Sequence, residues 1–294
     1  MTDRIVSAID PEGCVRVLAA VTTETVEHAR ETHNLFPTSC AALGRLLTGG
    51  ALMSCNLKNP TDALTLQIRC DGPIGGMVVI SGASLAVRGY AVNPYADPPL
   101  NDHGKFDVAA AVGTGSLSVI KDLGMREPYV GSVELISGEI AEDLTWYHAT
   151  SEQTPTVMTL GVLLAPDGRV LQSGGLFLQL MPEAGEDLIS ELETLVTALP
   201  PMTTMLEAGE TPESILSERF AALNLQVLDT RPVRYHCNCS EERMERNLVS
   251  LGRIELTELS EDPAGIELTC HFCNKRYRFS REAVGQLLER ATRP

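Results

Sequence analysis

Two tight pairs of cysteines near the C-terminus constrain this chain more than any other feature of its sequence. One residue separates Cys237 from Cys239, two residues separate Cys270 from Cys273, and 30 residues lie between the pairs. Tetrahedral zinc takes four soft ligands at about 2.3 Å, and two close pairs on opposing loops are a common way to supply them. The spacing therefore predicts one Zn²⁺ per chain, bound by all four thiolates.

The residues around the two pairs predict a small module that depends on the metal. Residues 266–269 and 277–279 are expected to form two short strands on either side of the second pair, and Ser240 is placed to cap a helix. Because a segment this polar buries few apolar side chains, a bound metal is the usual means of stabilising its fold. His236 and His271 can donate hydrogen bonds to the thiolates from outside the ligand set. Either histidine could replace a thiolate as a ligand, but the four available cysteines make that the minor case.

The other four cysteines show no metal spacing. They lie at least 15 positions apart in the first quarter of the chain, at Cys14, Cys40, Cys55 and Cys70. We interpret them as packing thiols, because a reducing cytosol disfavours a disulfide framework and free cysteines are usually buried. The N-terminus shows no secretory leader and no apolar run reaches about 18 residues, so we expect a cytoplasmic protein.

The distribution of charge excludes several classes of partner. The formal net charge is −16, and an acidic surface repels phosphate backbones and anionic lipids, so we expect no nucleic acid and no membrane as partner. Residues 231–294 carry 11 basic and 10 acidic residues, whereas the rest of the chain has a net charge of −17. This change coincides with the start of the cysteine region and argues for a separate C-terminal module.

The pattern of apolar residues predicts an α+β protein in three parts. Residues 1–181 are expected to form a mixed domain with a mainly antiparallel sheet and packed helices, residues 182–230 a helical linker, and residues 231–294 the four-cysteine zinc module. Successive strands joined by short turns are the reason to expect antiparallel pairing. The predicted strands are residues 16–21, 64–70, 76–80, 85–90, 116–121, 130–137, 158–165 and 170–172, and the predicted helices are residues 38–57 and 186–199.

No motif predicts an enzyme. Gly113-Thr114-Gly115 superficially resembles a phosphate-binding loop, but no third glycine, lysine or following helix completes it, so we expect no nucleotide. A serine nucleophile elbow is also absent from the sequence. Trp146, Tyr147 and His148 could form the edge of a site, and we interpret them as core packing.

The central part of the chain, together with the cysteines, resembles the 33-kilodalton heat-shock protein family, the redox-regulated holdase chaperones. The central segments that carry the resemblance are Gly113 to Val119, Lys121 to Gly124, Glu127 to Tyr129, Gly131 to Ile136, Ser137 to Thr145, Ser151 to Pro155, Gly174-Gly175 and Gln179 to Pro182. The two cysteine pairs, followed by Tyr277 and Phe279, fit the zinc motif of that family. The resemblance spans nearly the whole chain.

The resemblance implies an ATP-independent chaperone that is inactive when reduced and zinc-bound. Oxidants would convert the pairs into the disulfides Cys237–Cys239 and Cys270–Cys273 and release zinc. The C-terminal module and the adjoining linker would then unfold and expose apolar surface that binds unfolding client proteins under oxidative and heat stress. Active members of the family are dimers, so the resemblance also implies a homodimer in the oxidised state.

Two other classes of function stay open at this point. A zinc-ribbon nucleic-acid-binding regulator would use the same cysteine spacing, although the net charge of the chain argues against it. A thiol-disulfide oxidoreductase would use exposed cysteine pairs, but it would place them beside a βαβ pattern, which the C-terminal region lacks.

Overall fold

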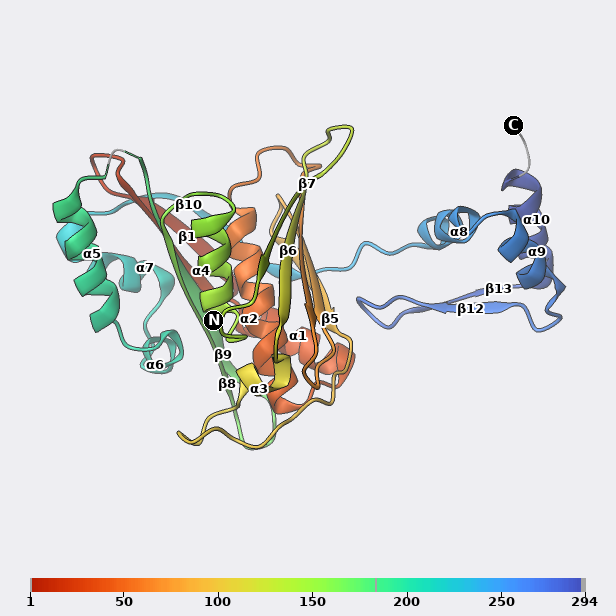
Figure 1. Cartoon of the computed structure of the whole chain (residues 1–294), viewed down its shortest axis with the longest axis horizontal. Coiled ribbons are helices and arrows are strands. Elements are labelled where there is room, and N and C mark those ends of the chain that lie inside the picture. Colours follow the sequence, from red (N-terminus) through yellow and green to blue (C-terminus); the bar gives the residue numbers. More distant parts are fainter. Residues whose placement is uncertain (1, 183, 292–294) are drawn as a thin grey trace. The chain divides into compact units, whose positions relative to one another are not determined.

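Two sheets with a buried helix between them form the larger part of the chain (Figure 1). The computed structural model describes residues 2–182 and 184–291. The chain divides between His236 and Cys237 into two compact units. The model confirms the predicted α+β class with mainly antiparallel strands. No helix within the described residues is long and apolar enough to cross a membrane.

The first sheet combines strands from both ends of the first unit. Its strands, in spatial order, are β10 (Gln226–Pro232), β1 (Arg4–Ile9), β2 (Val15–Val21), β9 (Val170–Leu180) and β8 (Thr156–Leu164). All neighbouring strands are antiparallel. A turn at Pro166-Asp167-Gly168 joins β8 to β9, and Gly168 has the positive φ of 85° that favours glycine.

The second sheet is built from consecutive hairpins, with one late strand at its edge. Its order is β11 (Arg234–Tyr235), β5 (Ala86–Ala91), β4 (Met77–Gly82), β3 (Ala63–Cys70), β6 (Gly115–Asp122) and β7 (Tyr129–Glu134). The pairs are antiparallel except for β11, which runs parallel to β5. The alternation of apolar and polar residues predicted β3, whose even-numbered side chains from Leu64 to Ile68 are buried.

Helix α2 (Pro37–Ser54) is buried along almost its whole length, because it packs against both sheets. A helix was predicted over residues 38–57, and the observed helix runs unbroken through Gly49 and Gly50. A Cβ atom at Gly49 would lie 2.5 Å from Leu144 Cδ1, and one at Gly50 would lie 2.9 Å from Val79 Cγ1. The two glycines therefore allow α2 to approach its neighbours closely. The other helices of this part are α1 (Thr23–His33), α3 (Val108–Val112) and α4 (Ala141–Thr150).

The opposite face of the first sheet is covered by the connector, residues 186–225. It contains α5 (Glu186–Ala198), α6 (Met202–Glu207), α7 (Pro212–Ser214), a π-helical turn (Ile215–Arg219) and a 3-10 turn (Ala221–Leu223). Its apolar side chains form a second core with those of the sheet, among them Leu192, Met205, Ile215 and Phe220. The Arg4 guanidinium makes two hydrogen bonds of 2.7 and 2.6 Å to the Glu213 carboxylate and lowers the pKa of that carboxyl to about 2.

Three sequence expectations in the first unit are corrected by the structure. The predicted helical character of the linker ends at Leu223, since residues 226–232 form strand β10 instead. Trp146 was interpreted as core together with Tyr147 and His148, but the Trp146 side chain is 42% exposed, while the other two are buried. Residues 231–236, assigned by sequence to the metal module, pair with strands of the first unit. The division into core, linker and switch stays a prediction.

The second unit is small. It consists of α8 (Glu241–Ser250), α9 (Arg253–Glu261), the hairpin of β12 (Ile266–Thr269) and β13 (Arg276–Phe279), and α10 (Arg281–Ala291). Ser240 caps α8 as predicted, because its hydroxyl accepts the Arg243 N–H at 3.3 Å. The buried core of this unit comprises Met244, Leu248, Leu256, Cys270, Tyr277, Phe279, Val284 and Leu287.

His148 is expected to make the first unit less stable in mild acid. Its ring is buried between Tyr147 and Phe177, and within the described residues neither ring nitrogen has a hydrogen-bond partner. Burial lowers the pKa of His148 to about 4, although Glu152 acts in the opposite direction. In the unfolded chain His148 binds a proton below about pH 6.5, whereas in the folded chain it binds one only below about pH 4. The free energy of unfolding therefore falls as the pH is lowered from about 6.5 to about 4.

Thermal melting at pH 7.5 and pH 5.0 measures this effect. A His148→Leu protein should lose about 2 kcal/mol less stability than the parent protein over that interval. His103→Gln, a change at an exposed histidine, is the matched control and should behave like the parent. An identical loss in the His148→Leu protein would show that the buried ring does not govern acid sensitivity.

Candidate metal centre

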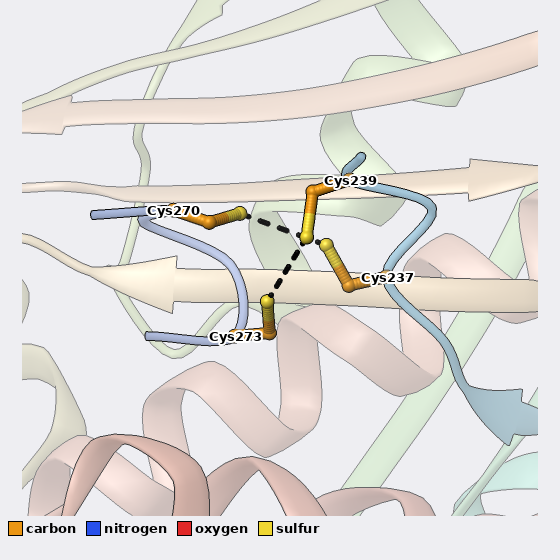
Figure 2. A group of neighbouring side chains, drawn as sticks. All are labelled: Cys237, Cys239, Cys270 and Cys273. Carbon is orange, nitrogen blue, oxygen red and sulfur yellow. Dashed lines mark hydrogen bonds between the residues drawn. The ribbon is translucent and has the colours of Figure 1, made fainter. Parts of the chain in front are cut away.

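The four cysteines of the two pairs converge on one point (Figure 2). Cys237 and Cys239 lie on the extended segment between β11 and α8, and Cys270 and Cys273 lie on the turn between β12 and β13. All four Sγ atoms lie within 4.8 Å of one another. Two contacts cross between the loops, at 3.7 Å from Cys237 Sγ to Cys270 Sγ and 3.3 Å from Cys239 Sγ to Cys273 Sγ.

The second cysteine loop is a tight turn at the end of a hairpin. Thr269 pairs with Arg276 at the last step of the ladder, and Cys270 N–H donates to the Lys275 carbonyl at 2.9 Å. Asn274 takes a positive φ of 55°, a conformation that asparagine tolerates better than most residues. The two-residue gap thereby places both thiols on the same side of the turn, which Figure 2 shows.

The spacing of the sulfurs fits a tetrahedral metal ion. Four thiolates at about 2.3 Å from a central zinc are about 3.8 Å apart from one another, close to the contacts across the loops. All four cysteines are free thiols, since the sulfurs are well beyond the bonding distance of about 2.05 Å. A set made only of thiolates suits Zn²⁺ or iron and excludes Mg²⁺ and Ca²⁺. Among the described residues this is the one cluster of three or more metal-ligating side chains within such reach.

The thiols differ in acidity within the cluster. Burial raises the pKa of Cys237 and Cys273, to about 11 for the latter. Burial acts in the same direction on Cys239, but hydrogen bonds from Tyr277 and from the neighbouring thiols outweigh it and lower the pKa of Cys239 to about 7. Without a metal, Cys239 is therefore the thiol most readily ionised among these three.

Tyr277 supports the cluster from outside the ligand set. Its hydroxyl donates a hydrogen bond of 3.0 Å to Cys239 Sγ, and the Lys275 ammonium lies 4.9 Å from the centre of its ring. A hydroxyl that donates to a thiolate withdraws electron density from the sulfur and fixes its position. The sequence places Tyr277 on a strand and, by resemblance, after the second cysteine pair of the zinc motif, but no spacing rule connects its hydroxyl to Cys239. The predicted hydrogen bonds from His236 and His271 to the thiolates stay a prediction.

Removal of the Tyr277 hydroxyl is expected to weaken metal binding and to speed oxidation. A Tyr277→Phe protein should bind zinc about 10–100-fold less tightly, the usual cost of a lost hydrogen bond to a metal ligand, and should release it faster in peroxide. Chelator competition measures the first effect and a zinc-sensitive dye the second. Lys275→Met keeps the hydroxyl and serves as the control. Unchanged affinity in Tyr277→Phe would refute this role.

The remaining candidates from the sequence are not brought into a site. Asp71 occupies the loop that resembled a phosphate-binding loop, since its carboxylate accepts the Thr114 N–H at 2.8 Å and the Thr114 hydroxyl at 2.7 Å. Burial raises the pKa of Cys40 to about 12 and that of Cys55 to about 11, so both thiols stay protonated and unreactive. Cys14 and Cys70 are half-buried.

Comparison with known proteins gives matches along nearly the whole chain. The family model described as "Hsp33 protein" matches residues 3–280. The 33 kDa chaperonin of Acetivibrio thermocellus is 49% identical over 289 residues, which cover 98% of both chains. That of Lachnoclostridium phytofermentans is 46% identical over 291 residues, which cover 99% of this chain and 100% of the relative. The crystal structure of the 33 kDa chaperonin (heat shock protein 33 homolog) from Thermotoga maritima is similar with a TM-score of 0.88, at 35% identity and 98% coverage of both chains.

Proposed function

Since the chain belongs to the Hsp33 protein family, we propose that it is a redox-regulated, ATP-independent chaperone. It binds unfolding proteins and prevents their aggregation under oxidative and heat stress. The observation that carries this proposal is the convergence of four thiols, at metal-binding distances, in a unit with a small core. The protein is not an enzyme in this proposal, and its place of action is the cytoplasm.

The reduced protein is the inactive state. Cys237, Cys239, Cys270 and Cys273 bind one Zn²⁺, which when bound joins the two cysteine loops to each other. Thiolate is both the ligand and the nucleophile, so the group that binds the metal is also the group that attacks an oxidant.

Oxidation proceeds pair by pair. One thiol of a pair attacks hydrogen peroxide and becomes a sulfenic acid with release of water, and the second thiol displaces a second water to close the disulfide. Each pair thus gives up two electrons, and peroxide is reduced to two molecules of water. The expected bonds are Cys237–Cys239 and Cys270–Cys273, because once the metal has left, only the short sequence spacing keeps two thiols together. Peptide mapping distinguishes these bonds from the pairs across the loops.

The connector covers the surface that the active state exposes. Leu192 and Val196 of α5 face Val157 and Leu178 of the first sheet across a cavity of about 510 Å³. This incomplete packing, with an open apolar lining, makes α5 easier to detach than a helix in a filled core. Detachment presents apolar surface to unfolding clients. The oxidised protein is a homodimer in this proposal, and no nucleotide takes part.

An aggregation assay tests the proposal. Reduced, zinc-loaded protein and peroxide-treated protein are each added to a heat-denatured client, with light scattering and zinc content measured in parallel and with or without ATP. We expect suppression only after oxidation and zinc release, and no effect of ATP. Equal suppression by the reduced zinc form, or release of client on addition of ATP, would contradict the proposal.

A further inference from the structure

One segment closes the edges of both large sheets. Residues 226–232 pair with β1 as β10, and residues 234–235 then pair with β5 as β11. The chain therefore passes along two sheet edges in succession before it reaches Cys237 and the metal cluster. Without this segment, β1 and β5 would present rows of unpaired main-chain N–H and C=O groups, which are templates for another strand.

β10 is attached to the sheet by main-chain pairing with β1, and its side chains pack very little against the rest of the protein. Every residue of β10 except Arg231 is exposed, and its two large apolar side chains, Val227 and Leu228, are 58% and 57% exposed. β1 is different, because Val6 and Ala8 are fully buried and the strand also pairs with β2. The strand β10 can therefore leave while β1 stays in place.

The register shows which main-chain groups of β10 face β1. Val233 N–H donates to the Asp3 carbonyl at 3.1 Å. Because donors alternate along an antiparallel pair, the N–H groups of Arg231 and Asp229 also face β1, and that of Thr230 faces away.

Pro232, which has no N–H, occupies a position where the N–H would face away from β1, as proline does in edge strands, so it removes no hydrogen bond to β1. One feature does weaken the pairing. The register shifts between Ser7 and Ala8, a bulge that leaves the ladder locally unpaired. The cover over β1 is short, irregular and exposed.

The strand β11 links this cover to the metal unit. The Tyr235 hydroxyl donates to the Gly89 carbonyl at 3.0 Å, and its ring stacks on His28 with a centroid distance of 4.8 Å. His236 N–H donates to the Val87 carbonyl at 2.9 Å, and Cys237 follows directly. Unfolding of the metal unit therefore removes the folded element that follows β11 in the sequence, and leaves only these contacts to hold the C-terminal end of the segment.

We propose that β10 is a displaceable cover strand, and that the edge of β1 beneath it accepts one extended segment of an unfolded polypeptide by main-chain pairing. This inference rests on the proposed function, since loss of the metal unfolds the unit that follows β11 and leaves the segment without a folded neighbour beyond His236. Pairing through the main chain depends little on which side chains the added strand carries. β10 itself shows this, because nearly all of its side chains are exposed. An edge of this kind accepts segments of many sequences, which a protein that binds diverse unfolding chains requires.

Hydrogen exchange on the full chain locates the client. The probe is reduced, carboxymethylated α-lactalbumin, a permanently unfolded protein with no thiol to exchange with the disulfides. We expect peroxide treatment to lower protection of the amides in Arg4–Ile9, and addition of the probe to restore it. Binding of the probe with protection gained only elsewhere would overturn this inference and leave the chaperone function intact. Absence of binding to the oxidised protein would overturn both.

Proline substitutions in β10 test the cover without any oxidant. Asp229→Pro removes an N–H that faces β1, and Thr230→Pro removes one that faces solvent, so the second is the matched control. The reduced, zinc-loaded Asp229→Pro protein should bind the probe about tenfold more than the Thr230→Pro protein, the factor that one lost hydrogen bond of about 1.4 kcal/mol represents. Zinc content and melting temperature verify that both variants are folded. Equal binding by two folded, zinc-loaded variants would refute the inference.

Discussion

Peroxide treatment with mild heat is expected to unfold residues 237–291 while the core of the first unit stays folded. The reason is the size of the two cores. Among the described residues the second unit buries eight side chains, one of which is the proposed ligand Cys270, whereas the first unit has two larger clusters, one on each face of its first sheet. Structural zinc contributes apparent binding energy of about 10–16 kcal/mol, which so small a core does not replace.

Hydrogen exchange measures this expectation. Protection in α8 to α10 should fall by at least about a thousandfold on zinc release, which corresponds to about 4 kcal/mol of local stability. The connector, residues 186–225, should lose part of its protection, and α2 should lose none. The control is zinc-loaded protein given the same heat without peroxide. Full protection of the second unit after zinc has left would show that the metal is dispensable there.

Loss of one ligand is expected to remove the metal from the reduced protein. In a Cys270→Ser protein, three thiolates remain and the hydroxyl is a poor zinc ligand, so the affinity should fall well beyond the 10–100-fold cost of a lost outer hydrogen bond. We expect zinc content after dialysis against a chelator to fall from about one ion per chain to nearly none. Elemental analysis for zinc and iron together identifies the metal.

A cysteine outside the cluster provides the control for this variant. Cys14→Ser removes a half-buried thiol of the first unit and should leave the zinc content unchanged. The Cys270→Ser protein should also suppress client aggregation without oxidant, because its second unit lacks the metal that is expected to keep it folded. If it retained zinc with the parent's affinity, the assignment of the four ligands would be wrong.

The parts of the fold predicted from sequence are those encoded locally. The hairpins β3–β4 and β8–β9 were predicted from alternating residues and turn residues, and α2 from its apolar run. β10 was missed because nothing on either face of Gln226–Pro232 is buried, so its sequence shows no period. Its strand conformation comes from pairing with β1, which lies more than 200 residues away in sequence. Pairing of this kind leaves no local signal.

The candidate site was predictable to the extent that spacing encodes it. Four thiols in two short-range pairs have few other uses in a reducing compartment, and the structure brings all four together. The contribution of Tyr277 was not predictable, because the register of β13 with β12 places its hydroxyl beside Cys239 and no spacing rule describes that register. The acidity differences among the thiols depend on the same contacts.

The order of strands in the first sheet also determines when each strand can pair during synthesis of the chain. β2 ends at Val21, and Val21 pairs with Gly174 of β9. After β2 has been made, the nascent chain must therefore grow by about 150 further residues before β2 can pair with β9. At about 5–20 residues per second, a ribosome needs roughly 8 to 30 s for that length. The second sheet, apart from β11, comes from a continuous stretch and is available earlier. β10 and the four cysteines of the metal cluster are made last. Each newly made molecule therefore passes through a stage in which the edge of β1 has no strand paired to it.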